Sequence, residues 1–220
     1  MKRATLSFDN GPTPGVTGRI LEILDRSGIR ATFFVIGTKL ENPSAIALMR
    51  KAHGAGHWIG NHTLTHSIAL GDRPDAAYAA MEIGETQRRI GALSHPDKLF
   101  RPYGKSGLTG PHLFSQAAKS YLLEQGYCTI LWDSVPGDWR DREGWVDLGL
   151  AQAQAQEWPT IVLHDIDDAC LARLPEFIDR LAGLGVEWRQ EFPDSVVMTR
   201  GGKIVSLSSS YIADQEPGNP

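Results

Sequence analysis

The sequence predicts an α/β protein in which about seven parallel strands curl into a barrel. Short apolar, β-branched or aromatic runs alternate along the chain with longer stretches of helical period, which is typical of repeated βα units. Reactive polar residues recur at the C-terminal ends of the predicted strands, where such sheets build their sites. With 220 residues, of which 41% are hydrophobic, the chain can fill one large core, so we expect a single domain over residues 1–220.

The expected strands are short runs bounded by turn residues or by helical stretches. They cover residues 4–8, 31–35, 57–61, 98–101, 127–132, 160–163 and 186–189. The apolar stripe of Ile20, Leu21, Ile23 and Leu24 predicts a helix after the first strand, with Gly28 as its stop. Further helices are predicted over residues 76–90, 111–126, 143–156 and 171–184.

The last part of the chain predicts a different element. Apolar residues 196–198 and 204–207 flank an Arg-Gly-Gly-Lys turn, which indicates a β-hairpin. Residues 215–220 are rich in polar residues, Gly and Pro, and we expect a frayed end there.

Composition excludes several classes of protein. The net charge is −4 and the basic residues are scattered, so a nucleic-acid partner is not expected. No stretch approaches the roughly 18 apolar residues of a membrane span, and the N-terminus lacks the apolar region of a signal peptide, so we expect a cytoplasmic protein without membrane contact. Cys128 and Cys170 are the only cysteines, and we expect two buried thiols.

Polar side chains follow five of the predicted strands. They are Asp9 and Asn10 after the first strand, His62 after the third, Arg101 after the fourth, Asp133 after the fifth and His164 after the sixth. Any one of them could be a turn residue or a satisfied polar group. Because the carboxyl ends of parallel strands meet at one edge, their joint placement predicts that they converge on one site.

The segment His-Thr-Leu-Thr-His places His62 and His66 four residues apart, so both imidazoles would face one ion if the segment formed a helical turn. This spacing is common by chance, and its position after a strand is what favours a metal site. The other histidines, His53, His57, His95 and His112, are expected to be core or surface residues.

Two further turns carry chemically useful groups. Asp9 and Asn10 stand where the first strand breaks into a Gly-Pro turn, although a simple Asx turn would look the same. Arg101 stands where a second predicted strand passes into a turn, which would place its guanidinium at the same edge of the sheet. The alternative is that Arg101 forms an ion pair at the surface. Asp165, with the neighbouring Asp167 and Asp168, is expected to lie in a solvated loop or helix cap.

In chain order, the segments SFDNGP, HTLTH, FRPYG, DSVPGDW and LH resemble the five motifs of the polysaccharide deacetylase family, also called the NodB homology or carbohydrate esterase family 4 proteins. The resemblance runs from Ser7 to His164 and implies a distorted (β/α), TIM-like barrel. It also implies a metal-dependent hydrolase that removes N-acetyl groups from a sugar, oligosaccharide or polysaccharide.

Position in these motifs implies a role for each residue. Asp9 matches the general base, His164 the general acid, Arg101 the arginine that orients the base and Asp138 the carboxylate that tunes the acid. The metal-ligand positions are occupied by Asn10, His62 and His66. The backbone N–H of Tyr103 corresponds to the oxyanion donor, and Trp139 and Leu163 would wall the pocket for the acetyl methyl group.

The chain departs from the family pattern at Asn10, where the family usually has a second Asp, and in the third motif, which is one residue shorter after Arg101. An amide oxygen brings no charge, so the resemblance implies a weakly bound divalent metal, zinc or alternatively cobalt. Two other functions stay open. One is hydrolysis of a small cytoplasmic non-peptide amide, with or without a metal, and the other is carbohydrate binding without catalysis. Metal content and acetate release separate the three.

Overall fold

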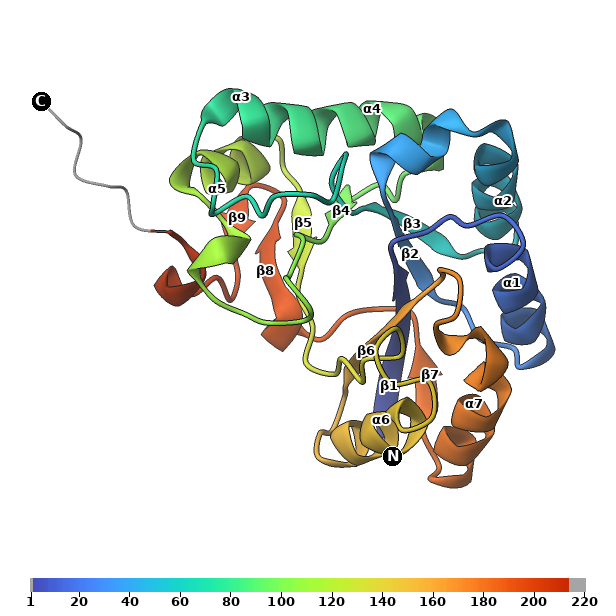
Figure 1. The fold of residues 1–220 in the computed structure, drawn as a ribbon. Coiled ribbons are helices and arrows are strands. Elements are labelled where there is room, and N and C mark those ends of the chain that lie inside the picture. Colours follow the sequence, from blue (N-terminus) through green and yellow to red (C-terminus); the bar gives the residue numbers. More distant parts are fainter. Residues whose placement is uncertain (1, 214–220) are drawn as a thin grey trace, which may run out of the picture.

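Strand β1 (Arg3–Asp9) is central to a nine-stranded sheet in the computed structural model of the protein, which describes residues 2–213 (Figure 1). The other strands are β2 (Thr32–Val35), β3 (Trp58–Asn61), β4 (Leu99–Phe100), β5 (Cys128–Ile130), β6 (Thr160–His164), β7 (Glu187–Arg189), β8 (Val197–Arg200) and β9 (Lys203–Ile204). The predicted frayed end, residues 215–220, lies outside the described residues.

The sheet follows the order β6-β1-β2-β3-β4-β5-β8-β9, and β7 pairs with the first residues of β1. Strands β1 to β7 pair in parallel, whereas β8 pairs antiparallel with β5 and β9 pairs antiparallel with β8. A narrow bridge completes the ring, since Ser134, shortly after β5, accepts a hydrogen bond from the Val162 N–H of β6 (2.9 Å). The predicted distorted barrel of about seven parallel strands is confirmed, with two antiparallel strands added to it.

Helices cover the outside of this sheet (Figure 1). They are α1 (Thr17–Arg26), α2 (Pro43–Gly54), α3 (Ala76–Ala79), α4 (Thr86–Ile90), α5 (Gln116–Glu124), α6 (Trp145–Gln154) and α7 (Leu174–Gly183). No residue range was predicted from the sequence for helix α2. Its start has clear local causes, because the Asn42 side chain accepts a hydrogen bond from the Ser44 N–H (2.9 Å) and Pro43 occupies the first turn.

The helix predicted over residues 76–90 is present, but it is not a regular α-helix. Its middle, Ala80–Glu85, is a π-helix between α3 and α4. The Asp75 side chain accepts a hydrogen bond from the Tyr78 N–H (2.6 Å) and so caps the start of the whole segment. A π-helical turn widens the helix by one residue and often marks a functional position.

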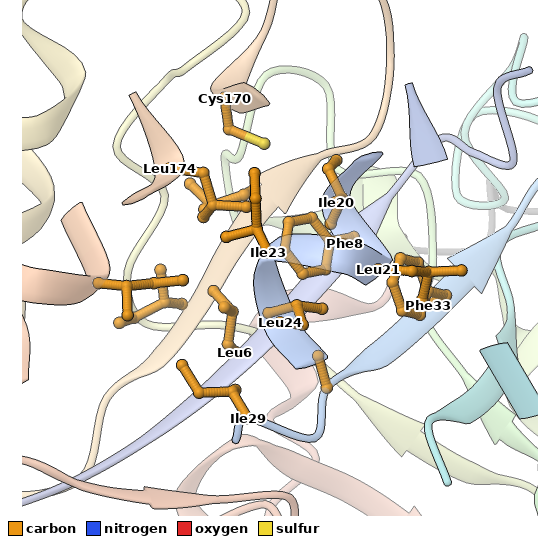
Figure 2. Close-up of a cluster of buried hydrophobic side chains, with 14 of the residues drawn as sticks. Leu6, Phe8, Ile20, Leu21, Ile23, Leu24, Ile29, Phe33, Cys170 and Leu174 are labelled. Atoms are coloured by element: carbon orange, nitrogen blue, oxygen red, sulfur yellow. The ribbon is translucent and has the colours of Figure 1, made fainter. Parts of the chain in front are cut away.

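The main core lies between β1, β2 and helix α1 (Figure 2). Leu6 and Phe8 of β1 are fully buried in it, and the Phe8 ring stacks on Phe33 of β2 with centroids 5.1 Å apart. Because side chains alternate along a strand, Ser7 and Asp9 face the opposite side, the barrel interior. The pattern of β1 therefore sends its apolar residues to the helices and its polar residues to the site.

Two further predictions of structure are confirmed. Strands β8 and β9 form the terminal hairpin, with Arg200 paired to Lys203 around the two glycines, although each strand differs by a few residues from its predicted range. Cys128 and Cys170 are buried free thiols. Among residues 2–213, the longest apolar helices are all too short to cross a membrane.

Candidate active site

Asp9 and Arg101 form an ion pair inside the barrel. The Arg101 side chain is fully buried, and its Nη1 donates hydrogen bonds to Asp9 Oδ1 (2.8 Å) and Ser7 Oγ (2.8 Å). Its Nη2 donates to the carbonyl of Leu131 (3.2 Å). The shortened third motif therefore does not displace the arginine, which orients the Asp9 carboxylate as the resemblance implies.

The Asp9 carboxylate stays charged in spite of its burial. Burial raises the pKa of Asp9, but Arg101, His62 and His164 together outweigh it, and the pKa lies below its ordinary value. At neutral pH the carboxylate is available to accept a proton. Its second oxygen, Oδ2, lies 3.6 Å from His62 Nε2.

His62 and His66 come together as predicted, but not on a helix. Their ring centroids are 4.7 Å apart, and the segment between them is an irregular loop in which Thr63 and His66 have φ values of 66° and 53°. The helical turn that the spacing suggested is therefore wrong. His62 Nδ1 bonds to the backbone carbonyl of Arg101 (2.9 Å), which places the proton on Nδ1 and leaves Nε2 with a free lone pair.

Asn10 supplies a third donor from the end of β1. Its amide oxygen is buried and has no hydrogen-bond partner within the described part of the chain. Its φ of 75° is unusual for a residue with a side chain, and the surrounding contacts must maintain it. An orphaned buried oxygen beside two histidines indicates a missing ligand rather than a simple Asx turn.

These groups fit a divalent metal ion. Burial lowers the pKa of His62 and, with His62 nearby, lowers that of His66 to about 3, so both imidazoles are neutral and can coordinate. Across residues 2–213, no three His, Cys, Asp or Glu side chains are grouped as a metal site. The proposed metal donors are instead the imidazoles of His62 and His66 and the amide oxygen of Asn10, and Asn is not one of those four residue types.

His164 stands at the end of β6 and is paired with Asp138. Its Nδ1 lies 2.8 Å from Asp138 Oδ1, and its backbone N–H donates to Asp138 Oδ2 (2.9 Å). Burial lowers the pKa of His164, but the hydrogen bond and charge of Asp138 outweigh burial, so the pKa is raised. The Trp139 ring meets the imidazole edge-on with centroids 4.3 Å apart.

The reactive groups line one cavity of about 200 Å³. Of the residues predicted for the site, those that line it are Asp9, Asn10, His62, His66, Tyr103, Trp139 and His164. Arg101 and Asp138 lie directly behind their partners and are fully buried. Tyr103 stacks on His66 with ring centroids 4.1 Å apart.

The prediction for Leu163 is wrong. Leu163 is fully buried in the core cluster beside Phe8, whereas its neighbour Val162 lines the cavity with His164. Strand alternation is the reason, because residues 162 and 164 face the interior and residue 163 faces the helices. Val162 is an apolar wall that the motif did not single out.

Asp165 also differs from its expected place in a solvated loop. It is buried, accepts a hydrogen bond from Thr17 Oγ1 (2.7 Å), and burial raises its pKa to about 7. A side chain at Gly11 would collide with it, since a Cβ there would lie 1.9 Å from its Oδ2. Asp165 thus packs under the turn that carries Asn10.

Two buried polar residues behind the histidine loop were not predicted. The Asn61 side chain accepts a hydrogen bond from the Thr63 N–H (3.0 Å), and Glu82 accepts three hydrogen bonds from the same loop. The sequence contained one indication that Glu82 is buried. It lies four residues from both Tyr78 and Thr86, on the face of the predicted helix that packs inward. No sequence pattern indicates which loop such a residue would reach.

The chain matches known proteins along most of its length. Residues 1–121 match the model of the polysaccharide deacetylase family. The peptidoglycan-N-acetylmuramic acid deacetylase PdaC of Bacillus subtilis is 31% identical over 189 residues, which are 84% of this chain and 37% of PdaC. A chitooligosaccharide deacetylase of Bradyrhizobium sp. is 31% identical over 165 residues, 73% of this chain and 69% of that protein.

The fold has solved counterparts as well. A family 4 acetyl xylan esterase from Clostridium thermocellum, in complex with a cobalt ion, superposes with a TM-score of 0.70 at 25% identity, covering 86% of this chain and 88% of the esterase. This chain spans only 37% of the length of PdaC. A family model that matches more than half of the chain, together with this shared barrel, shows homology, and the chain therefore belongs to the polysaccharide deacetylase family.

Proposed function

We propose that the protein is a metal-dependent hydrolase that removes N-acetyl groups from an amino sugar within an oligosaccharide or polysaccharide. The observation that carries this proposal is the placement of Asp9 and His164 in one cavity together with Asn10, His62 and His66. A proton acceptor and a proton donor beside a set of metal donors are what amide hydrolysis requires. The names of PdaC and of the Bradyrhizobium relative, which both act on N-acetylated sugars, support this substrate class.

Asp9 would act as the general base. It takes a proton from the attacking water, and Arg101 keeps its carboxylate charged and fixed in direction. A divalent ion held by Asn10, His62 and His66 would supply Lewis acidity toward the acyl oxygen and the water. Zinc suits two imidazoles best, and the neutral Asn10 makes its binding weaker than a carboxylate would.

His164 would act as the general acid. Its Nδ1 is bonded to Asp138, so Nε2 is the nitrogen that can protonate the departing amine. The Tyr103 N–H would donate to the tetrahedral oxyanion, and removal of such a donor costs roughly 10²–10³ in rate. Trp139 and Val162 would form the apolar wall beside the acetyl methyl group.

The test is acetate release from chitooligosaccharides, N-acetylmuramic acid-containing glycans, acetylated xylan and small N-acetyl amides, measured with metal-loaded and metal-stripped protein. Asp9→Asn is the matched control, because Asn can still accept the Arg101 hydrogen bond but cannot take a proton. Acetate release from an N-acetylated amino sugar supports the proposal if the release requires both the metal and Asp9. Release only from small amides would favour the alternative substrate, and binding of glycans without any release would leave only a carbohydrate-binding protein.

A further inference from the structure

Glu82 is a buried carboxylate that takes no part in the chemistry described above. It lies in the π-helix Ala80–Glu85, it is 1% exposed, and within residues 2–213 it has no ion pair with a basic side chain. A buried charge is costly unless hydrogen bonds satisfy it. The partners of Glu82 therefore indicate what the charge is for.

All side-chain partners of Glu82 belong to the loop between the two site histidines. Its Oε2 accepts hydrogen bonds from the backbone N–H groups of Leu64 (2.9 Å) and Thr65 (3.0 Å). Its Oε1 accepts from the hydroxyl of Thr65 (2.7 Å). Charge-assisted hydrogen bonds of this kind are roughly twice as strong as neutral ones.

The loop needs such support. Thr63 and His66 both have positive φ values, 66° and 53°, in a segment without regular secondary structure. Left-handed conformations are unfavourable for these residue types and persist only when neighbouring contacts enforce them. On the other side of the loop, the N–H groups of Gly37 and Thr38 donate to the carbonyls of Thr63 and Leu64, each at 2.9 Å.

Glu82 lies in the π-helical segment, against the histidine loop. The Thr86 hydroxyl donates to the Glu82 carbonyl (3.0 Å), and Glu82 faces the loop. Glu85, in the same π-helix, is partly exposed and pairs with Arg88 and Arg89 instead. Two glutamates in one short segment thus have different environments, one against the histidine loop and one at the surface.

We propose that Glu82 is a positioning residue that holds the His62–His66 loop in the conformation in which both imidazoles face one metal ion. The inference rests on the proposed metal-dependent function. Glu82 acts through its hydrogen bonds to the loop rather than as a charge beside the ion, because both oxygens of the carboxylate bond to the loop and neither lines the cavity.

Two substitutions separate geometry from charge. Glu82→Gln can keep all three bonds, since its oxygen accepts from the two N–H groups while its NH₂ donates to the Thr65 hydroxyl. Glu82→Met has similar length and no acceptor for these bonds. Glu85→Met is the control in the same segment, because its partner Arg88 is exposed and its other partner, Arg89, keeps an ion pair with Glu41.

The experiment titrates the apo-proteins with zinc and with cobalt, and follows hydrogen exchange of the Leu64 and Thr65 amides without metal. We expect Glu82→Met to bind zinc about 10- to 100-fold more weakly, as for other groups that orient metal ligands, and to exchange these amides faster. Glu82→Gln should stay within about threefold of wild type in the dissociation constant, because the geometry is kept. Glu85→Met should match wild type in both measurements.

If Glu82→Gln and Glu82→Met lose zinc affinity equally, the charge of Glu82 matters and the positioning role is wrong. If hydrogen exchange of the Leu64 and Thr65 amides is unchanged in Glu82→Met, Glu82 does not hold the loop and the proposal is also wrong. If Glu82→Met does not fold, Thr65→Val removes the hydroxyl that donates to Oε1, and a zinc affinity equal to wild type would then contradict the proposal. If wild-type protein binds neither ion, the proposed metal fails, and amide exchange still decides whether Glu82 holds the loop.

Discussion

Asn10 is the residue at which this chain departs most clearly from its family. Its amide oxygen is buried without a partner, and it lines the cavity together with His62 and His66. A neutral oxygen can coordinate a divalent ion but adds no charge to the site. In the proposed metal site, the affinity for the ion therefore depends on the chemistry of this single side chain.

Replacement of Asn10 by Asp should raise metal affinity. The change adds one negative charge next to the ion, and Coulomb attraction should lower the dissociation constant by roughly tenfold or more. Titration of both apo-proteins with zinc and cobalt at fixed pH measures the change. Asn42→Asp, an exposed cap of α2 far from the cavity, is the control with the same added charge. Indistinguishable constants for Asn10→Asp and wild type would show that Asn10 does not touch the metal.

The pair of His164 and Asp138 should set the pH range of the proposed activity. The raised pKa of His164 depends on its bond to Asp138, because burial alone lowers it. Asp138→Asn should therefore lower the pKa of His164, and the acid form should be lost at lower pH. The alkaline limb of the kcat/KM profile for acetate release should shift to lower pH. An alkaline limb that does not move would mean that His164 is not the acid that the profile reports.

At the scale of elements, one wall of the cavity is a strained loop held by a tryptophan. Lys105, Ser106 and Gly107 have φ values of 40°, 66° and 81° in succession. The Trp132 indole N–H donates to the Gly107 carbonyl (2.9 Å), and the ring packs so closely on Gly104 that a Cβ there would lie 2.2 Å from it. Because Tyr103 begins this loop, we expect Trp132 to hold the Tyr103 N–H in position.

Trp132→Phe should lower kcat for acetate release by about tenfold, part of the loss expected when an oxyanion donor is removed entirely. Trp158→Phe is the matched control, because the Trp158 indole N–H also donates one hydrogen bond, to Thr5 Oγ1 (2.9 Å), but at the other end of the barrel. The control should lose some stability and keep its kcat. Steady-state kinetics together with thermal melting measures both, and equal kcat values in the two variants would contradict the role of Trp132.

At the scale of the whole molecule, Arg101 joins strands that are far apart in the sequence. Arg101 directly follows β4 and donates hydrogen bonds to Ser7 and Asp9 of β1. It also donates to the carbonyls of Ile130 and Leu131 at the end of β5. Its Cζ atom lies 4.0 Å from the centroid of the Phe34 ring of β2. The barrel interior is thus organised around a fully buried guanidinium rather than around apolar side chains alone.

Arg101→Leu should destabilise the fold by about 3–5 kcal/mol at neutral pH, because Asp9 is left as a buried charge without its partner. In wild type the lowered pKa of Asp9 contributes stability that is present above the ordinary Asp pKa and is lost as the pH falls. The deficit of the variant should therefore be largest at neutral pH and smaller near pH 4, where the variant's Asp9 takes up a proton. Urea unfolding at both pH values measures this, and Asp9→Asn combined with Arg101→Leu should recover part of the loss. A deficit that is the same at both pH values would exclude an electrostatic cause.

The sequence by itself determined the barrel, the order of its elements and the residues that meet at its mouth. Periodicity and turn residues are local signals, and the rule that parallel strands end at one rim turns them into a prediction of which distant residues converge. Asp9, Asn10, His62 and His164 could be found in this way because each follows or ends a strand, and His66 by its spacing of four residues from His62.

Only the tertiary structure decided how these residues are held. The histidine loop is not helical, Val162 rather than Leu163 faces the cavity, and Asp165 is buried rather than in a solvated loop. Glu82, for which no role was predicted from the sequence, is buried behind the histidine loop. Each outcome depends on packing between segments that are distant in the sequence: the phase of a strand within the sheet, the π-helical turn behind the loop, and the turn that rests on Asp165. Apart from the strand alternation that turns Val162 inward, local patterns carry little information about such contacts, because the free energy that favours them arises only when the whole barrel has closed.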